Sequence, residues 1–381
     1  MLQIDLAGAE VLHPGGLSTA PLSLADGVIT DLTVGRVVDL SGYRVLPGII
    51  DVHGDGFERH LAPRRGAMKQ MAEGLIAVEA ELAANGITTG VLAQFVSWEG
   101  GLRGFEFADQ VFGTLRDVGA SLVSDLRPQL RFEVSLIDLY NELPTKVAEW
   151  GVEYIVFNDH LPHERLAEGR KPPRLTGQAL KAGRNPEDHF QMLLDLHTNV
   201  AQSQSLLNPL CAALKAQGAR IGSHDDNTAE GWATWAARGI EVAEFPETQE
   251  AAEAAQATGN HVVLGAPNVV RGGSHKGNVS ALDLVTMGLC DALASDYHYP
   301  SPRRAALMLA RSGLMDLASA WALVSSGPAA VLGLSDRGTL APGKRADIVI
   351  LDDADRVAAT IAGGRVSFMS GDVAERFVAA G

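Results

Sequence analysis

The chain has 381 residues, of which 46% are hydrophobic, and a formal net charge of −15 at pH 7. This length suits a barrel of about 250 residues with an additional domain. The acidic charge argues against a nucleic-acid-binding protein, whose binding surface would be basic. An anionic partner would therefore need a local basic site.

The sequence also limits where the protein works. It contains no apolar run of about 18 residues and no basic N-terminal segment followed by an apolar core, so we expect neither membrane insertion nor a cleaved secretory signal. The only cysteines, Cys211 and Cys290, lie in apolar stretches and offer no disulfide framework. We expect a cytoplasmic protein, and the sequence leaves open whether it forms a homo-oligomer.

Residues 1–45 are expected to form short strands, because turn signals recur there at Pro14-Gly15-Gly16, Asp26-Gly27 and Ser41-Gly42. Residues 335–381 return to this character, with a buried strand ending near Leu351 and a hairpin-like stretch around Gly363-Gly364. Since both ends are β-rich, we predict that they pair into one small discontinuous β domain.

Between these ends, residues 46–334 alternate apolar strand candidates with helical stretches. This alternation predicts an α/β fold, a (β/α)₈ TIM-like barrel. The eight strand candidates are residues 46–52, 86–92, 130–134, 154–157, 220–224, 242–245, 261–265 and 292–296.

The first of these strands ends in His53-Gly54-Asp55. In an extended chain, residues i and i+2 point to the same side, so the imidazole and the carboxylate can bind one ion together. Further residues of metal-ligand type are assigned to later strands: Glu133 to the fourth, His160 to the end of the fifth, His224 to the end of the sixth and Asp296 to the end of the eighth.

The carboxyl ends of barrel strands converge on one face, where active sites of this fold lie. We therefore expect two divalent metal ions about 3.5 to 4 Å apart, with an activated hydroxide between them. One ion would be held by His53, Asp55 and Asp296, the other by His160 and His224, and Glu133 would bridge both. Mixed imidazole and carboxylate ligation suits Zn, Mn or Fe, and Zn is the metal that we expect first.

Basic side chains in the loops expected on the same face favour a small phosphorylated substrate, because arginine forks match phosphate oxygens. The glycine-rich segment from Arg271 to Asn278 is the best candidate for anion binding. The predicted substrate-binding residues are Arg59, His60, Asp225, Asp226, Arg271, Ser274, His275 and Lys276, and further cations follow later strands at Lys171, Arg174, Arg303 and Arg304. The sequence does not decide whether Asp225 or Asp226 orients His224, contacts a ribose hydroxyl or caps a helix.

Several of these motifs carry a resemblance that covers essentially the whole chain. Pro47-Gly48-Ile49-Ile50-Asp51-Val52-His53, Ser295-Asp296 and Gly343-Lys344-Arg345-Ala346-Asp347-Ile348-Val349 resemble the amidohydrolase superfamily. This resemblance implies a metal-dependent hydrolase on a (β/α)₈ barrel, with a β domain built from both termini. The catalytic residue that we expect is Asp296, which would accept a proton from the activated water or orient that water.

A narrower resemblance is to the α-D-ribose 1-methylphosphonate 5-triphosphate diphosphatases of the carbon-phosphorus lyase pathway. The segments that carry it are 53–60, 223–228 and 265–278. It implies attack on a phosphoanhydride and release of pyrophosphate. Gly54 and Gly56 stand where that family has Thr and Asn, and the segment after Tyr297 also differs, which indicates a related subgroup with a substrate of its own.

Two other classes of function remain. The wider superfamily includes enzymes that hydrolyse C–N bonds, so the alternative is a deaminase or an amidase acting on a small cyclic amide or nucleobase-like substrate. Mononuclear deaminases place Glu three residues after the strand-5 His, a position that we assign to His163, and typical binuclear amidases carry a carboxylated Lys where Glu133 stands. A non-catalytic binding protein is disfavoured by the completeness of the ligand set.

Overall fold

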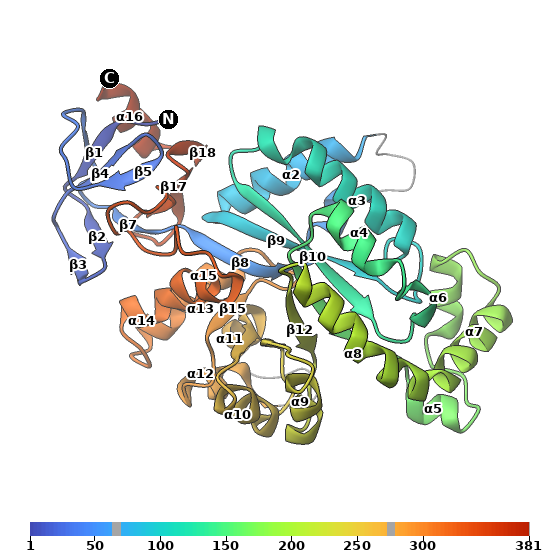
Figure 1. The fold of residues 1–381 in the computed structure, drawn as a ribbon. Helices are drawn as coiled ribbons and strands as arrows, with labels where there is room; N and C mark the ends of the chain where they lie inside the picture. Colours follow the sequence, from blue (N-terminus) through green and yellow to red (C-terminus); the bar gives the residue numbers. More distant parts are fainter. Residues whose placement is uncertain (63–69, 273–278, 381) are drawn as a thin grey trace. The chain divides into compact units, whose positions relative to one another are not determined.

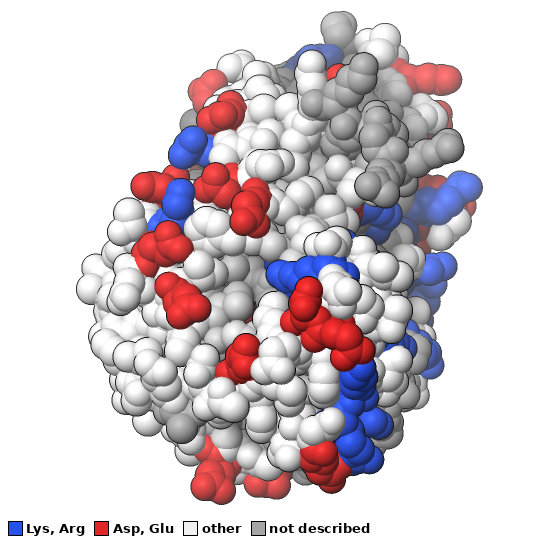
Figure 2. All heavy atoms as spheres, turned by 90° about the vertical axis from the view of Figure 1, so that its right-hand side faces the viewer, with Lys and Arg blue, Asp and Glu red and all other residues white. Residues whose placement is uncertain are grey.

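The computed structural model describes residues 1–62, 70–272 and 279–380 (Figure 1). The chain forms two compact units. Unit 1 comprises residues 1–92, 118–127 and 263–381, and unit 2 comprises residues 93–117 and 128–262. None of the described helices is both long and apolar enough to cross a membrane. Acidic and basic side chains lie interspersed on the face that Figure 2 shows.

Both termini contribute to the β sheets of unit 1, as the sequence predicted. Strand β7 pairs antiparallel with β16, where Pro47 lies opposite Ile348 and Val45 opposite Ile350. The N-terminal and C-terminal strands accordingly lie side by side in Figure 1. One sheet has the order β5-β4-β1-β6 and the other β18-β17-β16-β7-β2-β3. Their bounds are β1 Ile4–Ala7, β2 Glu10–His13, β3 Gly16–Ser18, β4 Leu22–Ala25, β5 Val28–Thr30, β6 Val37–Asp39, β7 Arg44–Pro47, β16 Ile348–Leu351, β17 Val357–Ala362 and β18 Arg365–Met369.

A single apolar core holds these sheets together. Ile4, Leu24 and Ile348 are fully buried in it, and helix α16 (Asp372–Ala379) adds Val373 and Phe377. Burying a side chain of this size contributes about 1.5 to 3 kcal/mol. The two ends of the chain are therefore joined by packing as well as by strand pairing.

The remaining strands form one eight-stranded parallel sheet in sequence order, from β8 to β15. At its two ends, Gly54, the last residue of β8, bridges Asp296 after β15 in parallel. The Asp296 amide donates to the carbonyl of His53 across 2.9 Å. The fold is a (β/α)₈ barrel, as predicted. Its strands are β8 Ile49–Gly54, β9 Ile87–Val96, β10 Asp125–Glu133, β11 Tyr154–Asn158, β12 Arg220–His224, β13 Val242–Glu244, β14 His261–Gly265 and β15 Ala292–Ala294.

The strand numbers assigned from the sequence were wrong for three residues. Glu133 lies in the third barrel strand, His160 follows the fourth and His224 ends the fifth. The strand candidates 46–52, 86–92 and 130–134 already make the strand of Glu133 the third, so the numbers given to these three residues were each too high by one. The segment between β9 and β10 holds helix α3 (Phe105–Val118) and a short 3₁₀ turn and contributes no strand.

Helices separate the barrel strands, and several begin at a side-chain cap. The Thr228 hydroxyl accepts the amide of Gly231 across 3.0 Å, and Thr248 accepts that of Ala251 across 3.1 Å. Such caps satisfy amides that have no partner inside the helix. The helices are α1 Glu58–Leu61, α2 Met71–Ala84, α3 Phe105–Val118, α4 Leu143–Trp150, α5 His163–Ala167, α6 Leu175–Lys181, α7 Pro186–Thr198, α8 Val200–Ala216, α9 Ala229–Ala236, α10 Gln249–Ala257, α11 Ala266–Arg271, α12 Ala281–Thr286, α13 Ser301–Arg311, α14 Leu317–Ala322 and α15 Ser326–Leu332.

Candidate metal and substrate site

Unit 1 brings together the backbone of three predicted ligands. The Asp55 amide donates to the Asp296 carbonyl across 2.9 Å, and the Asp296 amide donates to His53 across the same distance. Asp296 has φ 55°, which is unusual for a residue with a side chain. Strained backbone of this kind clusters at functional sites. His53, Asp55 and Asp296 therefore form one group at the strand ends of unit 1.

A buried carboxylate that sequence reasoning missed supports this group. Asp51 is fully buried, and its two oxygens accept the Ser295 amide at 2.8 Å and the Ser295 hydroxyl at 2.5 Å. Burial raises the pKa of Asp51, although the hydrogen bonds from Ser295 oppose that effect. Asp51 thus ties the first barrel strand to the last, directly beside the predicted ligands.

The glycines that distinguish this chain from the diphosphatase pattern have structural causes. A Cβ atom on Gly54 would lie 2.8 Å from both Asp51 Oδ2 and Tyr299 Cε1. One on Gly56 would lie 2.7 Å from Arg59 Nη1 and 3.1 Å from the Tyr297 carbonyl. Both glycines therefore make room for side chains or backbone of this chain, and Tyr299 fills the space beside the first of them.

The predicted substrate-binding residues Arg59 and His60 both contact Glu81 of α2. His60 Nε2 lies 2.5 Å from Glu81 Oε2, and Arg59 forms an ion pair with the other oxygen. Arg59 also donates to the Tyr297 carbonyl at 3.4 Å. Arg59 and His60 were predicted to bind the substrate, but in this structure the Glu81 carboxylate offsets the positive charge of Arg59.

Arg271 ends α11 and is exposed. It donates to the hydroxyl of Tyr297 across 2.7 Å and to Asn268 Oδ1 across 3.3 Å. These contacts direct its guanidinium toward the segment that follows Asp296. Ser274, His275 and Lys276, the other predicted members of this loop, lie outside the described residues.

In unit 2, Glu133 and His160 form a closely bonded pair. Glu133 is fully buried, with one oxygen 2.6 Å from His160 Nδ1 and the other accepting the His160 amide at 3.1 Å. Burial lowers the pKa of His160, but hydrogen bonds with Asp225 and Glu133 outweigh it and raise this pKa to about 9. The sequence analysis expected the two oxygens of Glu133 to bridge two metal ions, but in the structure both contact His160. Glu133 thus orients His160, as carboxylates that hydrogen-bond to metal-binding histidines commonly do.

Asp225 joins two histidines into a possible cation site. Its carboxylate lies 3.1 Å from His224 Nδ1 and 3.7 Å from His160 Nε2. One donor atom from each of the three residues lies within 4.8 Å of the others. Burial opposes ionisation of Asp225, but the two histidines outweigh it and hold the pKa of this carboxyl well below its usual range. Two imidazoles and a carboxylate suit Zn, Mn or Fe, so this donor set fits the expected cofactor.

Asp226 has a different role from its neighbour. It is buried and accepts the Ser223 hydroxyl at 2.5 Å, and its carbonyl accepts the Glu247 amide at 2.8 Å. Burial raises its pKa to about 6, and the negative charge of Asp225 adds to that increase. These contacts fix the segment that follows β12. Asp226 is not part of the candidate metal site formed by His160, His224 and Asp225.

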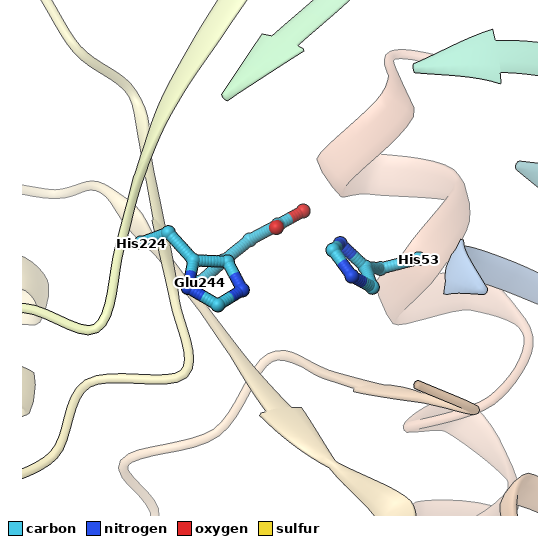
Figure 3. A group of neighbouring side chains, drawn as sticks. All are labelled: His53, His224 and Glu244. Atoms are coloured by element: carbon cyan, nitrogen blue, oxygen red, sulfur yellow. The ribbon is translucent and has the colours of Figure 1, made fainter. Parts of the chain in front are cut away.

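Two further polar residues of unit 2 were missed. Arg131 is 5% exposed, stacks on Phe95 at 3.9 Å and contacts His224 Nε2 at 2.8 Å. Glu244 is fully buried opposite His224 in the strand register and accepts hydrogen bonds from Gln129 and Tyr154 at 2.7 and 2.6 Å. Figure 3 shows His224 and Glu244 projecting from their strands, with His53 of unit 1 also labelled. In the sequence, the only indication that Arg131 or Glu244 belongs to a functional site was a charged residue in an otherwise apolar strand candidate.

The barrel, the β sheets made from both termini, and the imidazole and carboxylate groups near the strand ends define a (β/α)₈-barrel protein with candidate metal ligands. Residues 279–368 match the amidohydrolase family. The chain is 32% identical over 324 residues to the α-D-ribose 1-methylphosphonate 5-triphosphate diphosphatase of Escherichia coli, covering 83% of this chain and 85% of that one. The chain belongs to the amidohydrolase superfamily.

Two other similarities are to a short part of an adenine deaminase and to the fold of a deacetylase. An adenine deaminase of a Methylobacterium species is 45% identical over 75 residues, which are 19% of this chain and 13% of that protein. The crystal structure of N-acetylglucosamine-6-phosphate deacetylase from Pasteurella multocida has a TM-score of 0.64 at 10% identity, covering 96% of this chain and 99% of that one. The latter similarity concerns the fold alone.

Proposed function

We propose that this protein is a diphosphatase that cleaves a phosphoanhydride of a ribose 5-triphosphate of the α-D-ribose 1-methylphosphonate 5-triphosphate type and releases pyrophosphate. The observation that carries the proposal is the 32% identity to a diphosphatase over 83% of the chain. The His53-Gly54-Asp55 motif and the exposed guanidinium of Arg271 support it, because they offer a carboxylate ligand and a phosphate contact.

The cofactors in this proposal are two divalent ions, with Zn as the first candidate and Mn or Fe as alternatives. His53, Asp55 and Asp296 would hold one ion in unit 1, and His160, His224 and Asp225 would hold the other in unit 2. Glu133 would keep His160 in its orientation. Divalent ions in such sites lower the pKa of water toward neutrality and stabilise developing negative charge.

The side chains of this chain supply the remaining chemistry. Asp296 would take the proton from the attacking water, since its backbone is fixed by two hydrogen bonds beside the predicted ligands. Arg271 would offset charge on the triphosphate, because a guanidinium donates two parallel hydrogen bonds to phosphate oxygens. The water oxygen forms a bond to phosphorus as the bond to the departing pyrophosphate breaks.

The test is a substrate comparison with two product assays. The purified, metal-containing protein is incubated with ribose 5-triphosphates, nucleoside triphosphates and cyclic amides, and pyrophosphate and ammonia are measured. We expect pyrophosphate from a ribose 5-triphosphate and no ammonia. The Asp296→Asn variant, purified in parallel, identifies any contaminating phosphatase. Pyrophosphate release that is equal in this variant would contradict the proposal.

Hydrolysis of a C–N bond is the second candidate, favoured by the local identity to an adenine deaminase. The corrected strand numbering changes which residue is compared with the Glu of mononuclear deaminases. The strand-5 histidine is His224, so the position expected to hold Glu in mononuclear deaminases is Asn227 instead of His163. Asn cannot shuttle a proton as Glu does, so this position still argues against a deaminase. Ammonia release without pyrophosphate would favour this second candidate.

A further inference from the structure

Unit 1 contains a cavity of about 630 Å³ whose lining includes no predicted metal ligand. One wall is α13, the helix that follows the last barrel strand, and the other is the turn between β16 and β17. Four arginines line it: Arg303, Arg304, Arg311 and Arg356. On a chain with a net charge of −15, this concentration of cations is unexpected. The volume is typical of a cavity that holds a small molecule, about 300 to 1,000 Å³.

The periodicity of α13 explains why these side chains meet. Arg304, Met308 and Arg311 are spaced i, i+4 and i+7, which places them on one face of a helix. Ala305 and Leu309 are buried on another face. The sequence assigned Arg303 and Arg304 to a loop on the catalytic face. The assignment to a loop was wrong, because both lie in the first turn of α13.

The charges in this cavity are not balanced. Asp355, which is 4% exposed and has φ 61°, forms ion pairs with both Arg44 and Arg311, and its carbonyl oxygen accepts a hydrogen bond from Arg303. The Asp355 carboxylate thus pairs with two guanidinium groups, whereas Arg303 is hydrogen-bonded to an uncharged carbonyl oxygen of that residue. Arg356 is paired with Asp352 at 2.7 Å. The cavity therefore retains positive charge after its internal ion pairs are counted.

Two arginines keep donors available. The Nε atom of Arg303 is buried and has no hydrogen-bond partner among the described residues. The Arg304 side chain is exposed and forms no ion pair or hydrogen bond within the part of the chain that the structure describes. Burial lowers the pKa of Arg303, and the neighbouring charge of Arg304 lowers it further. A buried cation without a counterion is costly, so the arrangement favours an anion.

We propose that this cavity binds a small molecule that carries a phosphate group on a partly apolar body, with Arg303 and Arg304 contacting the phosphate. Phosphate is the group whose charge and oxygen geometry match several guanidinium forks at once. Leu307 and Met308, which also line the cavity, provide a surface for a sugar or base. A nucleoside monophosphate has this chemistry. The lining of the cavity includes none of the proposed metal ligands and not Arg271, so binding there can be tested independently of the diphosphatase proposal.

The test is calorimetric titration of the metal-containing protein with AMP, inorganic phosphate, pyrophosphate and citrate. The Arg304→Glu variant removes a cation that has no structural partner, and the Met308→Glu variant places a negative charge one turn further along the same face. Both are expected to weaken AMP binding at least tenfold, the loss that corresponds to one charge-assisted hydrogen bond. The matched control is Arg170→Glu, an exposed ion-paired arginine of unit 2, which should bind AMP as the wild type does.

Each outcome bears on the proposal. Weaker AMP binding in both variants, with the control unchanged, supports it. AMP binding that is absent in the wild type, or equal in all four proteins, would overturn it. Citrate that binds more tightly than AMP and the two phosphate probes would overturn the assignment to a phosphorylated ligand. Thermal unfolding shows that the variants are folded, and a given AMP concentration should raise the melting temperature of the wild type and the control more than that of the two variants.

Discussion

Arg131 donates a hydrogen bond from Nη2 to Nε2 of His224 across 2.8 Å. A guanidinium has no acceptor, so the imidazole nitrogen must accept. A neutral imidazole then carries its hydrogen on Nδ1, which lies 3.1 Å from Asp225. A cation could take the Nε2 lone pair of His224 only if Arg131 moved away. Arg131 and a metal ion therefore compete for this histidine.

We predict that Arg131→Met binds Zn²⁺ more tightly than the wild type, by about tenfold, or about 1.4 kcal/mol. The substitution removes both the competing donor and a buried positive charge. Affinity is measured at pH 7 by competition with a coloured chelator. Arg131→Lys, which retains the charge, is the control and should bind Zn²⁺ less tightly than the Met variant. Equal or weaker affinity in Arg131→Met would refute the competition.

Glu133→Gln should weaken metal binding about 10- to 100-fold, because a carboxylate that orients a ligating histidine has effects of this size. Glu133 Oε1 lies 2.6 Å from His160 Nδ1, and an amide retains the shape while losing the charge. The matched control is Asp226→Asn, another buried carboxyl group, whose partner is Ser223. If both variants bind the metal equally well, Glu133 has no orienting role.

Strand-end ligands were predictable from the sequence, whereas interior polar partners were not. His53, Asp55 and Asp296 each follow an apolar run, so their place at a strand end could be predicted. Arg131 lies inside β10, where alternation shows that a side chain is buried but not which neighbour it contacts. Glu244 ends β13, and its partners Gln129 and Tyr154 come from two other strands, which the sequence of β13 does not identify. The pairing of the termini followed from β character at both ends. Asp225 could not be assigned because its role depends on the left-handed backbone after β12.

Asp296→Asn should lose at least about 100-fold in turnover while retaining its fold, because general base catalysis commonly contributes 10²- to 10⁴-fold. Asn is the appropriate replacement, since it tolerates the left-handed φ of 55° better than Ala does. The backbone hydrogen bonds of residue 296 with His53 and Asp55 would remain. Turnover is measured by pyrophosphate release, and the fold by thermal unfolding. A variant that turns over at a near-normal rate would remove Asp296 from the mechanism.

Gly54→Ala should destabilise the protein by about 1 to 3 kcal/mol, the usual cost of overpacking a buried position. The added Cβ would lie 2.8 Å from Asp51 Oδ2 and Tyr299 Cε1 and 3.0 Å from Ser295 Oγ. Gly15→Ala is the control, because nothing lies within 4 Å of its Cβ position. Urea unfolding measures both. Adding Tyr299→Leu should restore part of the lost stability if Tyr299 is the reason for glycine here, and no recovery would show that it is not.

The ion pair between Asp125 and Arg337 predicts a pH-dependent stability in unit 1. Arg337 is 8% exposed and donates to Asp125 Oδ2 at 2.6 Å and to the Thr89 hydroxyl at 2.9 Å. Burial raises the pKa of Asp125, but the charges of Arg127 and Arg337 outweigh it, so the pKa is lowered. Because the folded pKa lies below the unfolded value, this carboxylate stabilises the fold fully above the unfolded pKa of about 3.9 and loses that effect as the pH falls through the folded pKa.

Arg337→Met should therefore lower the free energy of unfolding at pH 7 by about 3 kcal/mol, since breaking a buried ion pair leaves an uncompensated charge. The difference from the wild type should shrink as the pH falls below about 4, where Asp125 becomes protonated in the unfolded chain. Arg170→Met, which removes an exposed pair with Glu168, is the control and should change stability by less than about 1 kcal/mol. Urea unfolding at pH 7, 5 and 3.5 measures all three proteins. A difference between Arg337→Met and the wild type that stays constant over this range would show that the charge of Asp125 is not what Arg337 stabilises.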